Sequence, residues 1–220
     1  MNGASAALPC LPTGPSRAAA QRQALDRWRR VEFAAVLTLF AVGVVCLAEA
    51  SWIRGKAMLA QVLIARAWGQ AQAGMPSPRP WPWADTMPIA KLELPSHAPD
   101  QKAPELVVLD GASGRNLAFG PTHDPASVRP GEPGNSVIEG HRDTHFQALQ
   151  RMRVGDRIRV QGLDRRWVSF AVVDVRVVDS RRVRIALDSE VPRLTLVTCY
   201  PFDALVPGGP LRWVVTADRL

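Results

Sequence analysis

The sequence predicts an all-β domain, either a closed antiparallel barrel or a sandwich, behind a transmembrane helix near the N-terminus. From Pro88 onward, short β-prone runs alternate with glycine, proline and aspartate. Seven or eight such runs within roughly 130 residues are typical of these two architectures. One long apolar run lies upstream, and a segment rich in proline and tryptophan separates the two parts.

The N-terminal part divides into a tail and a membrane span. Residues 1–32 are rich in alanine, proline, serine and arginine, which predicts a basic, mostly disordered tail in the cytoplasm. Residues 33–53 are the predicted transmembrane anchor. The almost purely apolar run Phe33–Ala48 covers about 24 Å as a helix, and extension to Ile53 makes it long enough for a bilayer core.

The charges around this run predict its orientation. More arginines precede it than follow it, which favours a cytoplasmic N-terminus, a single-pass anchor in the inner membrane and a folded domain on the periplasmic side. The alternative is a cleaved secretory signal, because Ala48-Glu49-Ala50 fits a small-x-small processing site. Under either interpretation the rest of the chain leaves the cytoplasm.

Residues 54–85 are predicted to form a stalk helix and a proline-rich linker, and residues 86–220 the folded domain. The helix covers Lys56–Trp68, ends before Pro76, and is followed by a stiff, extended segment. In the domain, Asp143–Arg153 is predicted as helix. The predicted strands are Ile89–Leu94, Glu105–Leu109, Asn116–Phe119, Asn135–Glu139, Asp156–Gln161, Trp167–Val178, Leu194–Cys199 and Leu211–Ala217.

Charge and cysteine content limit the possible functions. The net charge of +7 is almost entirely due to arginines that alternate with apolar residues, as on the solvated face of antiparallel strands. With no nucleic-acid-binding signature, we expect no nucleic-acid partner. Cys10 lies in the tail, Cys46 in the span and Cys199 alone in the exported domain. A lone exported thiol is more often reactive than structural, and an inert buried thiol is the alternative.

Cys199 ends a predicted core strand, and Arg212 begins the next one after a loop rich in proline and glycine. A hairpin of this kind places both residues at one end of the sheet, where a guanidinium stabilises a thiolate and a developing oxyanion. His141 follows the predicted strand Asn135–Glu139 and a glycine, so it is the best general acid. Asp143 either orients His141 or caps the following helix.

The remaining histidines offer less. His97 and His123 lie in polar, proline-rich surroundings and are predicted to be exposed bystanders. His145 follows His141 by four residues, but no further metal ligand accompanies the pair. We therefore expect neither a metal nor another cofactor.

Several motifs resemble those of the sortase family over roughly residues 85–220. They are Gly140-His141, Thr195-Leu196-Val197-Thr198-Cys199 and Arg212, in the family's own order. The segments Trp81–Thr86, Gly140–Phe146 and Thr198–Asp203 also look like those of the proteobacterial class GN sortases.

The resemblance implies a closed eight-stranded barrel and a cysteine transpeptidase, a thiol protease-like hydrolase of the cell envelope. Such enzymes cleave a Leu-Pro-x-Thr-Gly (LPxTG) type C-terminal sorting signal of an exported protein through a thioester. An amine then accepts the acyl group. By position, Cys199 is the nucleophile, His141 the general acid and then base, and Arg212 the oxyanion clamp. The expected partner is a surface protein with a von Willebrand A-type domain.

The resemblance also implies supporting roles. The amide of Tyr200 is a second oxyanion donor, Thr198 shapes the turn and the substrate contact, and residues 179–193 form the loop over the Leu-Pro part of the signal. Two alternatives remain. The first is an L,D-transpeptidase acting on peptidoglycan, although Cys199 lacks the Ser-x-Gly-Cys context of those enzymes. The second is a non-enzymatic exported β domain with an inert thiol.

Overall fold

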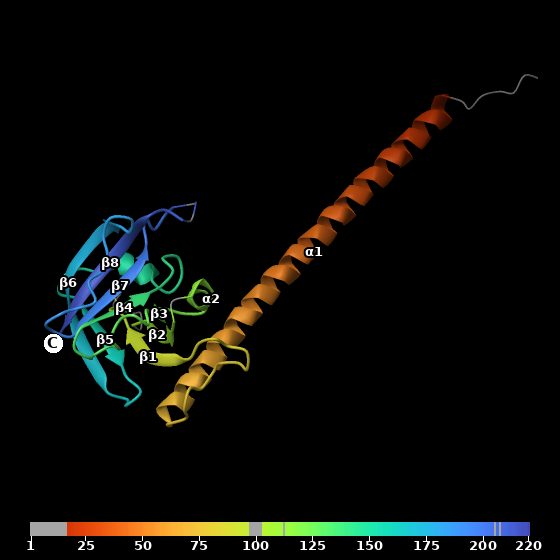
Figure 1. Ribbon diagram of the computed structural model, residues 1–220. Helices are drawn as coiled ribbons and strands as arrows, with labels where there is room; N and C mark the ends of the chain where they lie inside the picture. Colours follow the sequence, from red (N-terminus) through yellow and green to blue (C-terminus); the bar gives the residue numbers. More distant parts are fainter. Residues whose placement is uncertain (1–16, 97–102, 112, 205, 207) are drawn as a thin grey trace, which may run out of the picture. The chain divides into compact units, whose positions relative to one another are not determined.

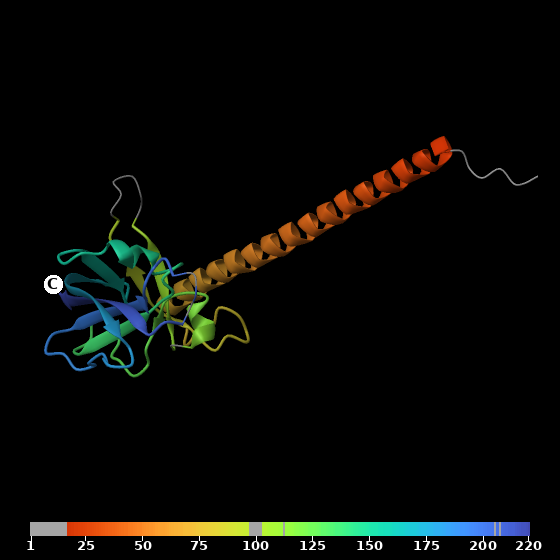
Figure 2. The same cartoon turned by 90° about the horizontal axis from the view of Figure 1, so that it is seen from above.

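The computed structural model describes residues 17–96, 103–111, 113–204, 206 and 208–220, so the predictions for Cys10 and His97 lie outside the described residues. Eight strands close into a barrel in the order β1-β2-β3-β4-β7-β8-β6-β5 (Figures 1 and 2). They are β1 (Pro88–Glu93), β2 (Glu105–Asp110), β3 (Thr122–His123), β4 (Asn135–Glu139), β5 (Arg157–Gln161), β6 (Trp167–Asp179), β7 (Arg193–Cys199) and β8 (Leu211–Arg219).

The barrel confirms the all-β, closed architecture, but it is not purely antiparallel. The pairs β2–β3 and β4–β7 are parallel, while the other pairs are antiparallel. Long connections join the parallel partners, as parallel pairing requires. The β4–β7 pair matters most for function, because both strands run toward the same end of the barrel and deliver their following residues there.

Two short elements differ from the prediction. Asn116–Phe119 was predicted as a strand, but the structure has helix α2 (Gly114–Leu117), whose first turn is capped by the hydroxyl of Ser113 accepting the amide N–H of Asn116. Strand β3 was not predicted, because two residues are too few to show a periodic pattern.

The predicted helix Asp143–Arg153 is reduced to a 3₁₀ helix, η1 (Gln147–Arg151). Phe146 and Leu149 are fully buried in the barrel core, in the same cluster as Ile138, Leu196 and Val215 from the strands. Residues 142–146 form a turn in which the amide of Phe146 donates to the carbonyl of His141 at 3.0 Å, so the helical segment begins only at Gln147. Side chains alternate along a strand. Because these residues of β4, β7 and β8 point into the barrel, the residues next to them in each strand point outward.

Helix α1 (Arg17–Gln72) is continuous from the predicted tail to the predicted stalk. The prediction that the tail is mostly disordered is therefore wrong for residues 17–32, whose arginines and alanines are good helix formers. In the part of the chain that is described, α1 is the one helix long and apolar enough to cross a membrane, and an N-terminal signal sequence would meet the same test.

The chain divides into two compact units between Gly55 and Lys56. The last turns of α1 thus belong with the barrel, and their buried residues recur at helical spacing: Ala60, Ile64, Ala67, Trp68 and Ala71. The linker is folded back, contrary to the extended prediction. The ring of Trp81 packs edge-on against Phe119 at 4.8 Å between centroids, and Ala84 is buried.

Candidate active site

Cys199 and Arg212 lie directly opposite each other in the antiparallel β7–β8 pair. This confirms the predicted hairpin geometry. Leu196 faces the barrel interior, and Val197 belongs to a separate apolar cluster on the outer face. Since side chains alternate along a strand, Cys199 and Arg212 share the outer face with Val197. The thiol is half-buried there and does not point into the barrel interior.

His141 reaches the same end of the barrel from β4. Glu139 lies opposite Val197 in the parallel β4–β7 pair, and the amide of Gly140 donates to the carbonyl of Val197 at 3.1 Å. Continuing this register places His141 level with Cys199. The imidazole is exposed.

Thr198 fixes the spacing between these strand ends. Its buried hydroxyl donates to the carbonyl of Gly140 at 2.7 Å. The adjoining turn is fastened to the β7–β8 loop, because the guanidinium of Arg142 donates to the carbonyl of Ala204 at 2.8 Å. The backbone on both sides of His141 is therefore held against the segments that flank Cys199.

Two of the predicted supporting roles do not match the contacts. The amide of Tyr200 donates to the carbonyl of Leu211 at 3.0 Å as a strand-pair bond, so it is not available to an oxyanion in this structure. Asp143 is exposed and makes no hydrogen bond to His141 within the described residues. It does not cap η1 either, since the capping position belongs to Phe146, which makes no side-chain cap.

Tyr200 instead supports the site through its ring. The ring stacks on Trp213 with centroids 5.8 Å apart, and Phe202 packs edge-on against the same indole, also at 5.8 Å. The indole N–H of Trp213 donates to the carbonyl of Leu149 in η1 at 3.1 Å. This aromatic group links the residues after Cys199 to the core and to the turn that carries His141.

Arg212 is directed toward the β7–β8 loop. Its Nη1 donates to the carbonyls of Gly209 at 2.6 Å and Leu211 at 3.0 Å. Its charge also acts on Glu139, a residue that the sequence did not single out. Burial raises the pKa of the Glu139 carboxyl, Asp124 raises that pKa further, and Arg212 opposes both effects. The active-site face thus carries a partly desolvated carboxyl besides the three predicted residues.

An apolar strip on the outer face leads to Cys199. Val137, Val197 and Val214 form its buried centre, and Val178, Ile185 and Leu187 pack against it. The last two come from the loop that joins β6 to β7. This loop is anchored to Asn135, whose amide donates to the carbonyl of Leu187 at 2.8 Å and whose side chain donates to that of Ala186 at 2.7 Å.

His145 lies near His141. Burial lowers the pKa of the His145 imidazole, and the charge of His141 lowers it further. Within the described residues, no group of three or more histidine, cysteine, aspartate or glutamate side chains is arranged to hold a metal ion.

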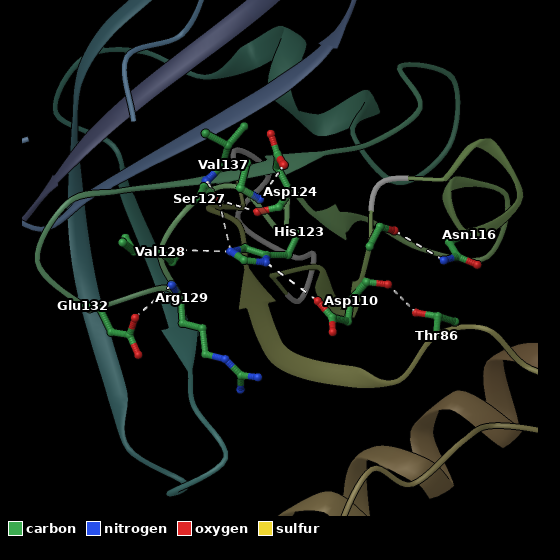
Figure 3. A network of polar contacts seen from close by, with 12 residues as sticks. Thr86, Asp110, Asn116, His123, Asp124, Ser127, Val128, Arg129, Glu132 and Val137 are labelled. Carbon is green, nitrogen blue, oxygen red and sulfur yellow. Dashed lines mark hydrogen bonds and ion pairs between the residues drawn. The ribbon is translucent and has the colours of Figure 1, made fainter. Parts of the chain in front are cut away.

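His123 was predicted to be exposed, but it is 4% exposed in β3 and sits between Asp110 and Ser127 (Figure 3). Its Nδ1 lies 4.0 Å from the Asp110 carboxylate, and its Nε2 lies 3.1 Å from the Ser127 hydroxyl. A carboxylate, an imidazole and a hydroxyl in this order also occur in the catalytic triad of serine hydrolases. The hydrogen bonds of His123 and Ser127, however, exclude a catalytic role of this kind. Nε2 lies 2.9 Å from the carbonyl of Val128, which can only accept, so Nε2 carries the proton.

A protonated Nε2 cannot act as the base for the Ser127 hydroxyl. That hydroxyl is itself occupied, because it donates to the carbonyl of Asp124 at 2.7 Å and accepts the amide of Val137 at 3.0 Å. The network therefore holds the β3–β4 connection in place. The sequence suggested exposure because the segment is polar, and the burial arises from tertiary contacts with β2.

Comparison with known proteins identifies the family. Residues 98–220 match the sortase domain. The chain is 32% identical to Sortase D of Bacillus subtilis (strain 168) over 117 residues, which are 53% of this chain and 58% of that protein. The chain thus spans less than two thirds of that curated relative.

Solved structures share the fold. Sortase A from Corynebacterium diphtheriae superposes with a TM-score of 0.54 and 23% identity over 63% of each chain. Sortase A of Listeria monocytogenes gives a TM-score of 0.52 and 22% identity over 60% of this chain and 87% of that one. The sortase domain match covers more than half of the chain and contains β4, β7 and β8. The chain therefore belongs to the sortase family.

Proposed function

We propose that this protein is a membrane-anchored cysteine transpeptidase that cleaves an LPxTG-type sorting signal and transfers the acyl part to an amine. The observation that carries the proposal is the pairing of Cys199 with Arg212 on the outer face of the barrel. The register of the β4–β7 pair, continued past Gly140, puts His141 level with this pair. Membership in the sortase family gives this arrangement its chemical interpretation.

In the first step the thiolate of Cys199 attacks the carbonyl carbon of the threonine in the signal. A sulfur–carbon bond forms, and the carbonyl electron pair moves to oxygen. Collapse of this intermediate breaks the carbon–nitrogen bond, and His141 gives its proton to the departing amine. The product is a thioester on Cys199. In the second step an amine gives a proton to His141 and attacks the thioester carbon. The new carbon–nitrogen bond forms, the carbon–sulfur bond breaks, and the thiolate of Cys199 and the protonated His141 are restored.

Arg212 is the group proposed to stabilise the oxyanion. Its Nη1 is held by two loop carbonyls, which leaves the other N–H groups of the planar guanidinium to donate to the oxyanion. A charged donor aimed at developing charge typically accounts for 10²–10³ in rate. The loop carbonyls thus orient the fork without neutralising its charge.

The apolar strip of Val137, Val197 and Val214 is the proposed site for the Leu-Pro part of the signal. Its apolar character and its continuity with Cys199 favour an apolar peptide lying along β7. The loop between β6 and β7, anchored at Asn135, covers this strip. The proposed partner is an exported protein with a C-terminal sorting signal, and a von Willebrand A-type domain in that partner is part of the proposal.

The proposed location is the inner membrane, with the barrel on the periplasmic side. The apolar part of α1 and its arginine-rich N-terminal flank support a single-pass anchor with that orientation.

The experiment that tests the function uses the full chain in detergent or nanodiscs with a quenched LPxTG peptide library and triglycine as acceptor. Turnover that is lost in Cys199→Ala supports the proposal. Undiminished cleavage by Cys199→Ala contradicts it. Turnover of a muropeptide without turnover of any sorting peptide would favour the L,D-transpeptidase, and alkylation of Cys199 no faster than that of a free thiol would favour the inert domain.

A further inference from the structure

Glu139 is an ionisable residue on the outer face that no step of the proposed mechanism uses. It follows Val137 on the same face of β4 and lies directly opposite Val197. Val137 and Val197 are 3% and 6% exposed and belong to the apolar strip that leads to Cys199. The carboxyl of Glu139 therefore lies at the edge of the proposed substrate strip, one position along the face from the nucleophile.

Among the residues that the structure describes, the Glu139 carboxylate has no hydrogen-bond or ion-pair partner. Arg212, whose charge reaches it, has its Nη1 engaged by Gly209 and Leu211. Asp124 adds repulsion from the other side, and its Oδ1 already accepts the amide of Ala126 at 2.9 Å.

A half-buried carboxylate without a donor is costly, because the water it loses is not replaced. Such groups in native proteins usually have a partner, and an exception calls for an explanation. Burial and Asp124 raise the pKa of Glu139, as expected for a carboxyl that lacks a nearby donor. A cationic group arriving in the strip would remove this cost, and it would meet the carboxylate beside the reacting atoms.

We propose that Glu139 is a specificity-determining residue that binds a cationic group of a substrate next to Cys199. The inference rests on the proposed transpeptidase function. Two sources supply the same chemistry: a lysine or arginine side chain at the variable position of the sorting signal, and the ammonium form of the accepting amine before it loses its proton.

A different role would be that Glu139 positions Arg212. The two roles make different predictions. A positioning residue changes turnover by one factor for every substrate, whereas a binding residue changes the ratio between charged and neutral substrates. The test is therefore the ratio of turnover between charged and neutral substrates, measured in each variant and compared with the wild type.

The experiment uses the full chain in nanodiscs and three LPxTG peptides with lysine, norleucine or glutamate at the variable position. Hydroxylamine, which is largely neutral at pH 7, is the acceptor in the first arm. In the second arm the norleucine peptide is fixed, and triglycine is compared with hydroxylamine. We expect Glu139 to favour the cationic substrate about tenfold or more in one arm. In the first arm this preference falls to about one in Glu139→Gln and reverses in Glu139→Lys; in the second arm the ratio of triglycine to hydroxylamine turnover falls about tenfold in Glu139→Gln.

If the preference is lost in the first arm, the cation is the side chain in the sorting signal. If it is lost in the second arm, the cation is the accepting amine. Glu132→Gln removes an exposed glutamate outside the site and should keep the wild-type ratios. An equal fall in kcat for all substrates in Glu139→Gln, or unchanged ratios in both arms, overturns the inference.

Failure of the proposed function is a separate result. If the wild type turns over no peptide, or if Cys199→Ala still cleaves, the transpeptidase proposal fails. Binding of the lysine and norleucine peptides to Cys199→Ala, measured by fluorescence anisotropy with and without Glu139→Gln, then tests Glu139 independently. Equal Kd values for the two peptides would overturn the inference on that readout.

Discussion

Cys199 and Arg212 can act on the same substrate because they lie opposite each other on the outer face of β7 and β8. The sequence predicted that Cys199 and Arg212 lie at one end of the sheet, and the strand pairing confirms this, because a strand ending in a thiol, a short loop and a following strand form a hairpin. The place of His141 beside them stays a prediction, which the β4–β7 register supports. It could not predict that the amide of Tyr200 is used in the strand pair. It also passed over Glu139, because a glutamate at a strand end is ordinarily solvated.

The guanidinium geometry of Arg212 gives a first prediction. Arg212→Lys keeps the positive charge but loses the planar fork that both donates to the loop carbonyls and faces the site. We expect kcat for peptide cleavage to fall about 100-fold or more. Circular dichroism and Tm should change little, and full activity in this variant would remove Arg212 from the mechanism.

Glu139 gives a prediction about stability against pH. Its folded-state pKa is raised above the ordinary value of 4.5. Between pH 4.5 and the folded-state pKa, the folded protein therefore holds a proton that the unfolded chain has lost. The stability associated with this group is present below pH 4.5 and is lost as pH rises through the folded value. Relative to wild type, Glu139→Gln should therefore gain Tm between pH 4 and pH 7. A difference in Tm that stays constant over this range would contradict the assignment.

At the scale of elements, the site depends on how the ends of β4 and β7 are joined. The hydroxyl of Thr198 bonds to Gly140 beside His141, and the hydroxyl of Thr195 makes a comparable buried bond to Asn135 at the far end of the same pair. Sequence patterns predicted both strands, but they could not reveal these cross-strand bonds. The parallel register that creates them is set by tertiary structure.

The two threonines form a matched pair for mutation. Thr198→Val and Thr195→Val each leave a buried acceptor without its donor, so each should lower the free energy of unfolding by about 1–3 kcal/mol. Thr198→Val alone should also lower kcat, because it frees the strand end that carries His141. Chemical denaturation and peptide turnover measure the two effects, and equal losses of kcat in both variants would refute the local role.

Gly140 gives a second prediction for this element. A β-carbon at this position would lie 2.7 Å from the ring of Phe146, a fully buried core residue. Gly140→Ala should therefore displace the turn that carries His141, cost about 1–3 kcal/mol of stability and reduce turnover. Gly114→Ala is the control, because a β-carbon there meets nothing within 4 Å. Gly155→Ala is less suitable, because Gly155 has a positive φ that alanine rarely adopts.

At the scale of the whole molecule, the barrel and the last turns of α1 form one compact unit from Lys56 onward. Composition predicted a boundary near residue 86, because the intervening segment is rich in proline and resembles a linker. Burial of Ile64 and Trp68 places that boundary earlier. The two-residue strand β3 and the buried His123 were missed for a related reason, since long-range packing and not local sequence determines them.

This organisation predicts how the domain responds to changes in the helix. Ile64→Ala removes buried methyl groups from the helix face and should lower the free energy of unfolding of the domain by about 2–5 kcal/mol. Leu59→Ala, at an exposed position on the same helix, is the control and should have a much smaller effect. An unchanged unfolding transition in Ile64→Ala would show that the helix is an independent stalk.

The proposed reaction requires that Cys199 form a thioester with the sorting signal, assisted by His141 and Arg212. Intact-protein mass spectrometry of the full chain, mixed with an LPxTG peptide in the absence of an amine, tests it most directly. We expect a covalent adduct with the mass of the peptide up to its threonine, located at Cys199, released by hydroxylamine and absent in Cys199→Ala. Peptide cleavage that proceeds without any adduct and persists in Cys199→Ala would contradict the account.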